Sequence, residues 1–164
     1  MNKKQTARRQ FIEDVGDVLE EHGLTHMAGR VLGALMICVP TQMSMDQLAD
    51  QLQASKGSIS SATQMLLRMG IIEKISLPGH RRHYFQLRSN LWSHLIEQDA
   101  EHLDKHRMLA EDGLAMLEGE PVEMKRRLLE MQVFCDFIEE EWPGLLDRWE
   151  KREKEVSRSL PEYE

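Results

Sequence analysis

The chain has 164 residues and a formal net charge of −7, with 41% hydrophobic and 30% charged residues. This length suits one globular domain, or a small module with an appended helical part. The mean hydropathy of −0.50 argues against a membrane protein, and the longest uncharged apolar run, Val31 to Val39, is too short to span a bilayer.

The N-terminal stretch, the two cysteines and a search for catalytic motifs narrow the class of protein further. The N-terminal stretch has bases but no apolar segment or cleavage site of a secretory signal, so we expect a cytoplasmic protein. Cys38 and Cys135 belong to no C-x-x-C pair, and their apolar neighbours favour reduced, buried thiols. No glycine-rich phosphate loop or paired nucleophile and base is present, so we expect neither an enzyme nor a cofactor.

Positive charge is concentrated in the middle of the chain. Residues 55–90 hold six Lys and Arg against one acidic residue, whereas residues 91–164 hold ten against twenty. A basic segment in an acidic protein indicates one localised contact with a polyanion.

Two helices are predicted before this segment. An apolar stripe of period 3.6 predicts the first over residues 6–22, and Gly23 ends it. Thr25 can cap a second helix that runs to about Cys38, because Pro40 stops it. The stripe of the first helix consists of Phe11, Val15, Val18 and Leu19.

Residues 44–70 have the pattern of a helix-turn-helix. Ser44 and Gln47 have capping-box spacing at the start of a short helix. Ser55 can cap a longer helix that reaches Met69, with Gly70 as the residue after its C-cap. Two short helices joined by a tight turn form this DNA-binding motif.

The longer helix has two unlike faces. Its apolar face holds Ile59, Ala62, Leu66 and Met69. Its opposite face is small and polar at the N-terminal end and cationic at Arg68, which suits a helix that enters a major groove. The residues predicted to contact DNA, with those of the following hairpin, are Ser55, Lys56, Gly57, Ser60, Ser61, Gln64, Arg68, Arg81, Arg82 and His83.

A β-hairpin is predicted next, from "IIEKIS", "LPGH" and "RRHYFQL". Directly after a helix-turn-helix such a hairpin is a wing. Arg81 and Arg82 lie at or beside its tip, where an arginine suits the narrow, electronegative minor groove.

The remaining chain is predicted to be helical, to Gly119 and again from Pro121. Apolar residues spaced 4-3-4-3-4 run from Met124 to Trp142, and a second stripe contains Leu129, Val133 and Phe137. A helix that is apolar on two sides needs more than one neighbour, and a second subunit can supply it. Pro143 is expected to break or kink this helix.

In this order of elements the chain resembles the MarR superfamily of winged helix-turn-helix regulators, and most of all its GbsR-like branch, which includes a mycobacterial efflux repressor. The likeness rests on "THMAGRVLGALMIC", "SMDQLADQLQASKGSISSATQMLLRMGIIEKI" and "GHRRHYFQLR". Two residues depart from the family pattern. His80 stands where an acidic residue often braces the wing arginine, and Gln53 stands where older helix-turn-helix turns favour glycine.

The resemblance implies a homodimer on a pseudo-palindromic operator, with a small apolar or aromatic effector that disables DNA binding. It divides the chain into an N-terminal dimerisation helix (1–24), a winged helix-turn-helix domain (25–88) and a C-terminal dimerisation region (89–164). Candidate effector contacts are Trp92, Asp99 and His106, which lie on one helical seam. If that seam is buried, its polar residues need partners.

Histidine spacing raises a metal hypothesis. His102 and His106 are four residues apart, as are His22 and His26 across a helix break. No third strong ligand accompanies either pair, so a charged, solvated surface explains them and no metal is predicted.

The sequence thus predicts a mainly α protein with a small β-hairpin wing, a winged helix-turn-helix flanked by long dimerisation helices. The predicted function is a dimeric transcriptional regulator, a repressor released by a ligand. The alternative is a winged-helix module that docks on an acidic protein partner without specific DNA binding.

Overall fold

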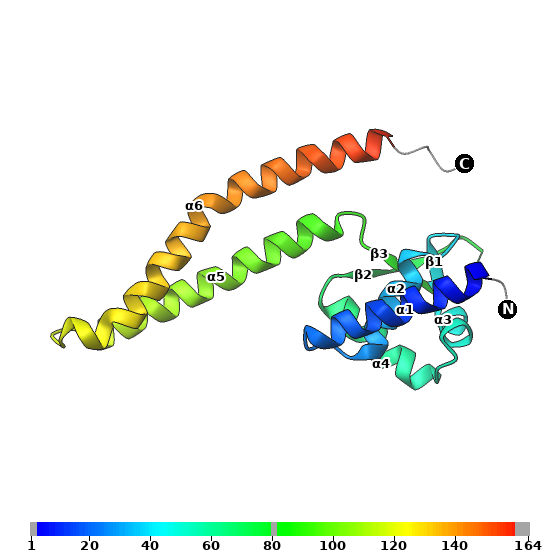
Figure 1. The fold of residues 1–164 in the computed structure, drawn as a ribbon, viewed down its shortest axis with the longest axis horizontal. Helices are drawn as coiled ribbons and strands as arrows, with labels where there is room; N and C mark the ends of the chain where they lie inside the picture. The colour runs from blue at the N-terminus through cyan, green and yellow to red at the C-terminus, as the bar shows by residue number, and fades with distance from the viewer. Residues whose placement is uncertain (1–2, 80–81, 160–164) are drawn as a thin grey trace. The chain divides into compact units, whose positions relative to one another are not determined.

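Two packed helices, α1 (Lys3–Glu21) and α2 (His26–Met36), open the chain (Figure 1). The structure is a computed structural model that describes residues 3–79 and 82–159, without the side chains of residues 99–101. Thr25 caps α2 as predicted, because its side chain accepts a hydrogen bond from the backbone nitrogen of Ala28.

Glycines let α1 and α2 pack backbone to backbone. A Cβ atom added to Gly29 would lie 2.6 Å from the Cα atom of Gly16 and 2.6 Å from the backbone oxygen of Val15. Such a close approach is possible only without side chains at the crossing. Arg30 adds a polar tie, since its Nε is 3.0 Å from Oε1 of Glu13 and its Nη2 donates to the backbone oxygen of Leu52 at 2.9 Å.

The helix-turn-helix consists of α3 (Met45–Leu52) and α4 (Lys56–Arg68). The predicted capping box is confirmed: Ser44 and Gln47 exchange side chain to backbone hydrogen bonds at the start of α3. At the end of α4, Gly70 has φ +65°, and its nitrogen bonds to the Leu67 oxygen while that of Ile71 bonds to the Leu66 oxygen. These two bonds form the Schellman ending that the glycine predicted.

The turn between the two helices has a left-handed residue. Gln53, the C-cap of α3, has φ 50° and ψ 46°. Glycine adopts this conformation at little cost, whereas a residue with a Cβ atom is strained there. The departure at Gln53 therefore leaves the turn in place and adds local strain to it.

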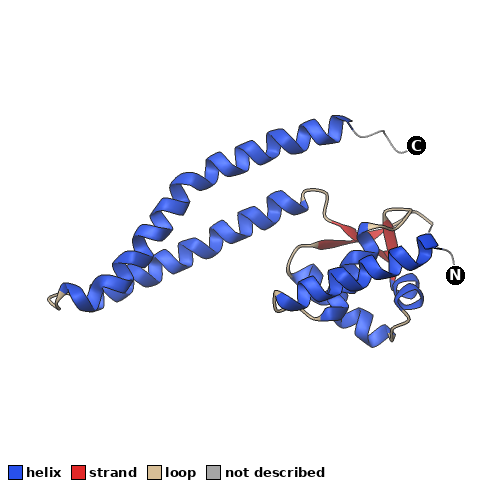
Figure 2. Cartoon of the chain, viewed as in Figure 1, coloured by secondary structure: helices blue, strands red, loops and turns tan. Residues whose placement is uncertain are grey.

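The first unit also contains a small antiparallel sheet, whose strands come before and after the helix-turn-helix in the chain (Figure 2). Strands β2 (Ile72–Ser76) and β3 (His83–Leu87) form the predicted wing hairpin, with Lys74 opposite Phe85. The sequence analysis missed a third strand, β1 (Gln42–Ser44), which pairs with β3 and gives the order β1-β3-β2. Because β1 leads directly into α3, the sheet joins the wing to the helix-turn-helix.

The core under these elements is apolar and continuous. Ile59, Ala62 and Leu66 are at most 2% exposed, as the predicted apolar face of α4 requires, while Met69 at its end is half-buried. Thr63 is also buried, and its hydroxyl donates to the backbone oxygen of Ile59 at 2.9 Å. The other hydrophobic residues at most 3% exposed in this core are Ala28, Val31, Ala34, Leu35, Leu48, Leu52 and Ile72.

Two long helices, α5 (Leu91–Met116) and α6 (Val122–Ser159), run antiparallel to each other. Trp149 Nε1 donates to Ser93 Oγ at 3.2 Å near one end of the pair. A Cβ atom on Gly113 would lie 2.8 Å from Leu128 near the other end. These two contacts connect the helices at two places far apart along the pair.

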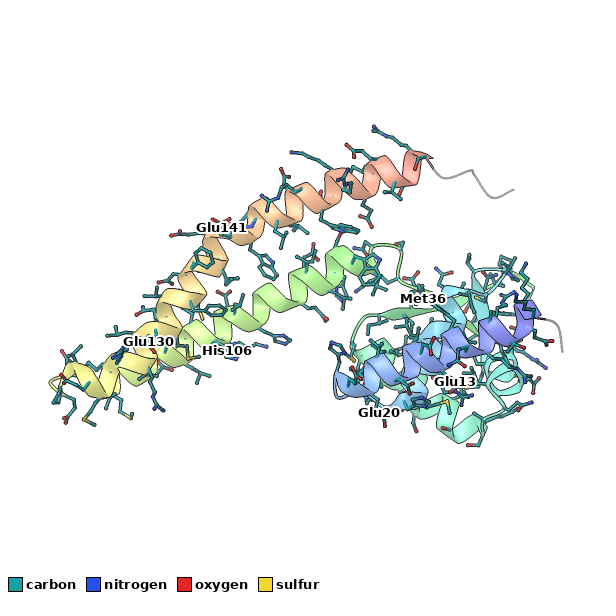
Figure 3. All side chains as sticks on the ribbon, viewed as in Figure 1. Glu13, Glu20, Met36, His106, Glu130 and Glu141 are labelled. Atoms are coloured by element: carbon teal, nitrogen blue, oxygen red, sulfur yellow. The ribbon has the colours of Figure 1, made fainter. Side chains whose placement is uncertain are left out.

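Helix α6 is not broken at Pro143. It is one helix from Val122 to Ser159 with Pro143 inside it, and its ribbon bends near Glu141 (Figure 3). Proline lacks the N–H that would bond to the residue four positions earlier, so a kink at this place is expected. Of the two outcomes predicted for Pro143, the kink is the one observed.

The chain divides into two compact units, Met1–Leu91 and Trp92–Glu164. Helix α1 is part of the first unit with the winged helix-turn-helix, and its predicted role in dimerisation stays a prediction. Within residues 3–79 and 82–159, no helix combines the length and the apolar character needed to cross a membrane.

Candidate nucleic-acid interface

Helix α4 presents its polar face to solvent. Gly57, Ser61, Gln64 and Arg68 are exposed, and Ser60 is half-buried at the edge of this face. Since Ile59 and Leu66 on the opposite side are completely buried, the helix is held by one face and free on the other. This is the arrangement that a recognition helix needs to reach base edges.

The N-terminus of α4 is fixed by Ser55. Its hydroxyl oxygen accepts a hydrogen bond from the backbone nitrogen of Ser58 at 3.1 Å. The sequence analysis gave Ser55 two roles, helix cap and DNA contact, and the cap is the role that this geometry supports. Beside it, Gly57 has open space around its Cα, with Ser55 Oγ at 3.9 Å as the nearest atom to an added Cβ.

The wing carries part of the predicted basic surface. Arg82 directly precedes β3, and its side chain is 69% exposed. His83, the first residue of β3, is exposed, and its Nδ1 lies 3.3 Å from Ser76 Oγ on β2. Arg81 and His80, which the sequence analysis placed at the tip, lie outside the described residues.

A carboxylate that the sequence analysis did not single out joins the two parts of this surface. Asp46 Oδ1 lies 2.6 Å from Lys56 Nζ, and its Oδ2 lies 3.0 Å from Arg82 Nη1. The hydrogen bond and charge of Lys56 lower the pKa of the Asp46 carboxyl, and Arg82 lowers it further. Read along the chain, Asp46 is only an acidic residue in the first turn of a helix, so no local pattern marks its partners.

Two of the three candidate effector residues, Trp92 and His106, have described side chains, and both are exposed. Trp92 is 53% exposed, and His106 is exposed on α5 (Figure 3), where its Nδ1 donates to the backbone oxygen of His102 at 2.8 Å. The side chain of Asp99 lies outside the described residues. Because His106 is exposed, its polar ring can contact water and needs no buried partner.

One group of side chains has the composition of a metal site, although no metal was predicted. Among the described residues, ligand atoms of Asp17, Glu20 and His26 lie within 4.8 Å of one another. His26 Nε2 is 3.1 Å from Asp17 Oδ1, and Glu20 lies farther along α1 from Glu13 (Figure 3). Both carboxylates are exposed, so an ion pair across the α1–α2 corner explains the group.

The two thiols differ in burial. Cys135 is 2% exposed, as its apolar context predicted. Cys38 is half-buried, its Sγ donates to the backbone oxygen of Leu35 at 3.4 Å, and burial raises the pKa of the thiol. A raised pKa keeps Cys38 protonated and less reactive at neutral pH.

Comparisons with known proteins identify the family. A profile of the MarR family matches residues 22–83, and one described as "MmpR5-like MarR family transcriptional regulator" matches residues 90–152. The HTH-type transcriptional regulator MmpR5 of Mycobacterium tuberculosis is 36% identical over 143 residues, which are 87% of each protein. The chain belongs to the MarR family of transcriptional regulators.

Two further matches agree with this MarR-family assignment. A crystal structure of a transcriptional regulator has a TM-score of 0.78 at 34% identity and covers 88% of this chain and 99% of that chain. The HTH-type transcriptional repressor GbsR of Bacillus subtilis is 26% identical over 81 residues, which are 49% of this chain and 44% of GbsR. The resemblance to winged helix-turn-helix regulators of the MarR family is confirmed.

Proposed function

We propose that this MarR-family regulator is a homodimeric repressor that binds a pseudo-palindromic operator with α4 in the major groove and the wing in the adjacent minor groove. The observation that carries the proposal is the two-sided character of α4. Its inner face is buried in the core, and its outer face offers Gln64 and Arg68, which pair well with adenine and guanine edges.

Charge supports the same assignment. The basic segment 55–90 contains α4 and the wing, while the second unit is acidic. Phosphate contacts supply most of the affinity of such proteins and make it depend on salt. An acidic remainder limits adhesion to DNA elsewhere on the molecule.

The dimer is supported by the outer face of α6. Val133, Phe134 and Phe137 are 65%, 58% and 56% exposed, and Val122 and Leu129 extend the same patch. Exposed aromatic and branched side chains in one contiguous patch mark an interface. A second copy of the chain can cover two such patches at once by twofold symmetry. The two recognition helices would then meet half-sites about one DNA turn apart.

Release by a small apolar or aromatic effector is the part of the proposal that rests on the family resemblance, together with exposed Trp92 at the start of the second unit. The effector would favour a dimer whose recognition helices are wrongly spaced, a population shift limited by its differential affinity for the two states. As a regulator that acts on DNA, the protein is proposed to work in the cytoplasm.

Anisotropy titrations test the DNA-binding part. DNA from upstream of the protein's own gene and scrambled DNA are titrated at several salt concentrations with wild type and with Gln64→Ala. We expect wild type to prefer the natural sequence, and Gln64→Ala to lose about 1–3 kcal/mol of that preference. The control is Gln132→Ala, the same substitution on half-buried Gln132 of α6.

Equal and weak binding of wild type to both DNAs would refute the proposal and favour the alternative, a winged-helix module for an acidic protein partner. The dimer is tested separately by light scattering, with 19.1 kDa as the mass of one chain. Val133→Asp places a charge in the α6 patch and is expected to give monomers. Ser157→Asp adds the same charge at an exposed position outside the patch and should leave the dimer intact.

A further inference from the structure

Three elements of the DNA-binding surface meet at one carboxylate. Asp46 lies in the first turn of α3, Lys56 is the first residue of α4, and Arg82 precedes β3. Each cation approaches a different oxygen, Lys56 Nζ at 2.6 Å from Oδ1 and Arg82 Nη1 at 3.0 Å from Oδ2. Asp46 can therefore hold both cations at the same time.

The position of Asp46 is itself well fixed. Ser44 and Gln47 close the capping box around it, with the Ser44 nitrogen donating to Gln47 Oε1 at 2.8 Å. Ser44 is also buried and belongs to β1, which is paired with β3 of the wing. The carboxylate is 36% exposed and faces the positive end of the α3 dipole, which favours its charged form. Backbone and sheet thus hold Asp46 where the two cations need it.

Both cations keep donors for another anion. A lysine ammonium has three N–H donors and an arginine guanidinium five. Within residues 3–79 and 82–159, each of these two side chains has one ion pair, to Asp46. Their side chains are 74% and 69% exposed. These two cations and Asp46 therefore form an exposed cluster with one net positive charge. Phosphate can bind this cluster without displacing the carboxylate.

We propose that Asp46 is a positioning residue of the DNA-binding surface, which couples the wing to the recognition helix and sets the preference for operator over other DNA. This inference rests on the proposed function. Without Asp46, two long side chains are free to bind any phosphate and must be ordered again at the operator. Ordering such side chains lowers affinity, while the removed negative charge raises affinity for every DNA.

The expected result is a change in the ratio of the affinity for operator DNA to the affinity for scrambled DNA. In Asp46→Asn, affinity for scrambled DNA rises and the ratio of operator to scrambled affinity falls about tenfold. Asp46→Glu keeps the charge and restores most of the ratio. Asp50→Asn is the matched control, because Asp50 is an exposed acid of the same helix with no ion pair among those found in the described residues. It removes the same charge and should leave the ratio within about twofold.

A double-variant cycle separates positioning from a general effect on folding. If Asp46 acts through Arg82, then Asp46→Asn changes the ratio much less in an Arg82→Ala background than in wild type. Thermal unfolding of each variant checks that the first unit is intact, because a purely structural role lowers operator and scrambled binding together and leaves the ratio unchanged.

The outcomes can be told apart. A wild type that discriminates between the DNAs, with Asp46→Asn keeping the full ratio or matching Asp50→Asn, overturns the role of Asp46 and leaves the proposed function standing. Wild type that binds operator and scrambled DNA alike refutes both. A fall of the ratio in Asp46→Asn alone, reversed by Asp46→Glu, supports the coupling.

Discussion

Gly29→Ala is expected to destabilise the first unit strongly, because Gly29 is where α2 meets the backbone of α1. The added Cβ would lie 2.6 Å from the Cα atom of Gly16 and equally close to the backbone oxygen of Val15. Favourable contacts between carbon atoms begin at about 3.5 Å. Backbone cannot rotate away as a side chain can, so the helices must separate by about 1 Å.

The size of the effect follows from two opposing terms. Overpacking a well-packed core costs about 1–3 kcal/mol, and a contact with backbone belongs at the upper end. Alanine returns about 0.5–1 kcal/mol through its better helix propensity. The net loss is about 2 kcal/mol, which lowers the Tm of a unit of this size by about 8–16 °C.

Circular dichroism melts of wild type, Gly29→Ala and Gly57→Ala measure the difference. Gly57 is also a helical glycine, but the nearest atom to its added Cβ is 3.9 Å away. Gly57→Ala should therefore stabilise the fold by about 0.5–1 kcal/mol. An unchanged or higher Tm for Gly29→Ala would show that α1 and α2 do not cross in this way. The Gly57 variant is also a probe of the interface, since its methyl group enters the proposed major-groove face.

Three further changes test local features. Gln53→Gly relieves the left-handed turn at φ 50° and should raise the free energy of unfolding by about 0.5–1 kcal/mol in a urea titration. In an NMR pH titration, the Asp46 carboxyl should titrate below its ordinary range because its pKa is lowered. The stability that this carboxylate contributes is present above the unfolded-state pKa, and it is lost as pH falls through the folded-state pKa. Trp149→Phe removes the indole donor to Ser93 and should destabilise the second unit by about 1 kcal/mol in a thermal melt.

Features that depend on neighbouring residues could be predicted from the sequence. The caps at Thr25, Ser44 and Ser55 and the glycine ending of α4 each involve groups within a few residues of one another. Their hydrogen bonds follow from residue type and spacing. The two faces of α4 follow from helical periodicity in the same way.

Strand β1 could not be predicted because nothing local defines it. It has three residues, Gln42 to Ser44, and its partner β3 lies about forty residues later in the chain, with Met43 opposite Phe85. Three residues are too few to establish an alternating pattern. The pairing becomes visible only when the helix-turn-helix folds and brings the two segments together.

Pro143 illustrates a prediction that local chemistry leaves open. The missing N–H predicts a defect in the helix but does not decide between a break and a kink. Contacts of α6 with α5 lie on both sides of Pro143: Arg107 Nε is 3.5 Å from Glu139 Oε2 before it, and Trp149 bonds to Ser93 after it. Helix α6 is therefore connected to α5 on each side of the bend, which no pattern local to Pro143 could have indicated.

Asp46 shows why a charge count along the chain describes a surface incompletely. By position, Asp46 belongs to the acidic residues that precede the basic segment, and the count assigns all six bases of residues 55–90 to the polyanion contact. In space, Asp46 contacts two of those bases, Lys56 and Arg82, and its negative charge offsets one of their two positive charges. A residue that lowers the charge of a DNA-binding surface reduces its affinity for every phosphate. The same residue contacts both cations, and in the role that we propose for it this arrangement favours the one DNA geometry that fits them, at the expense of affinity.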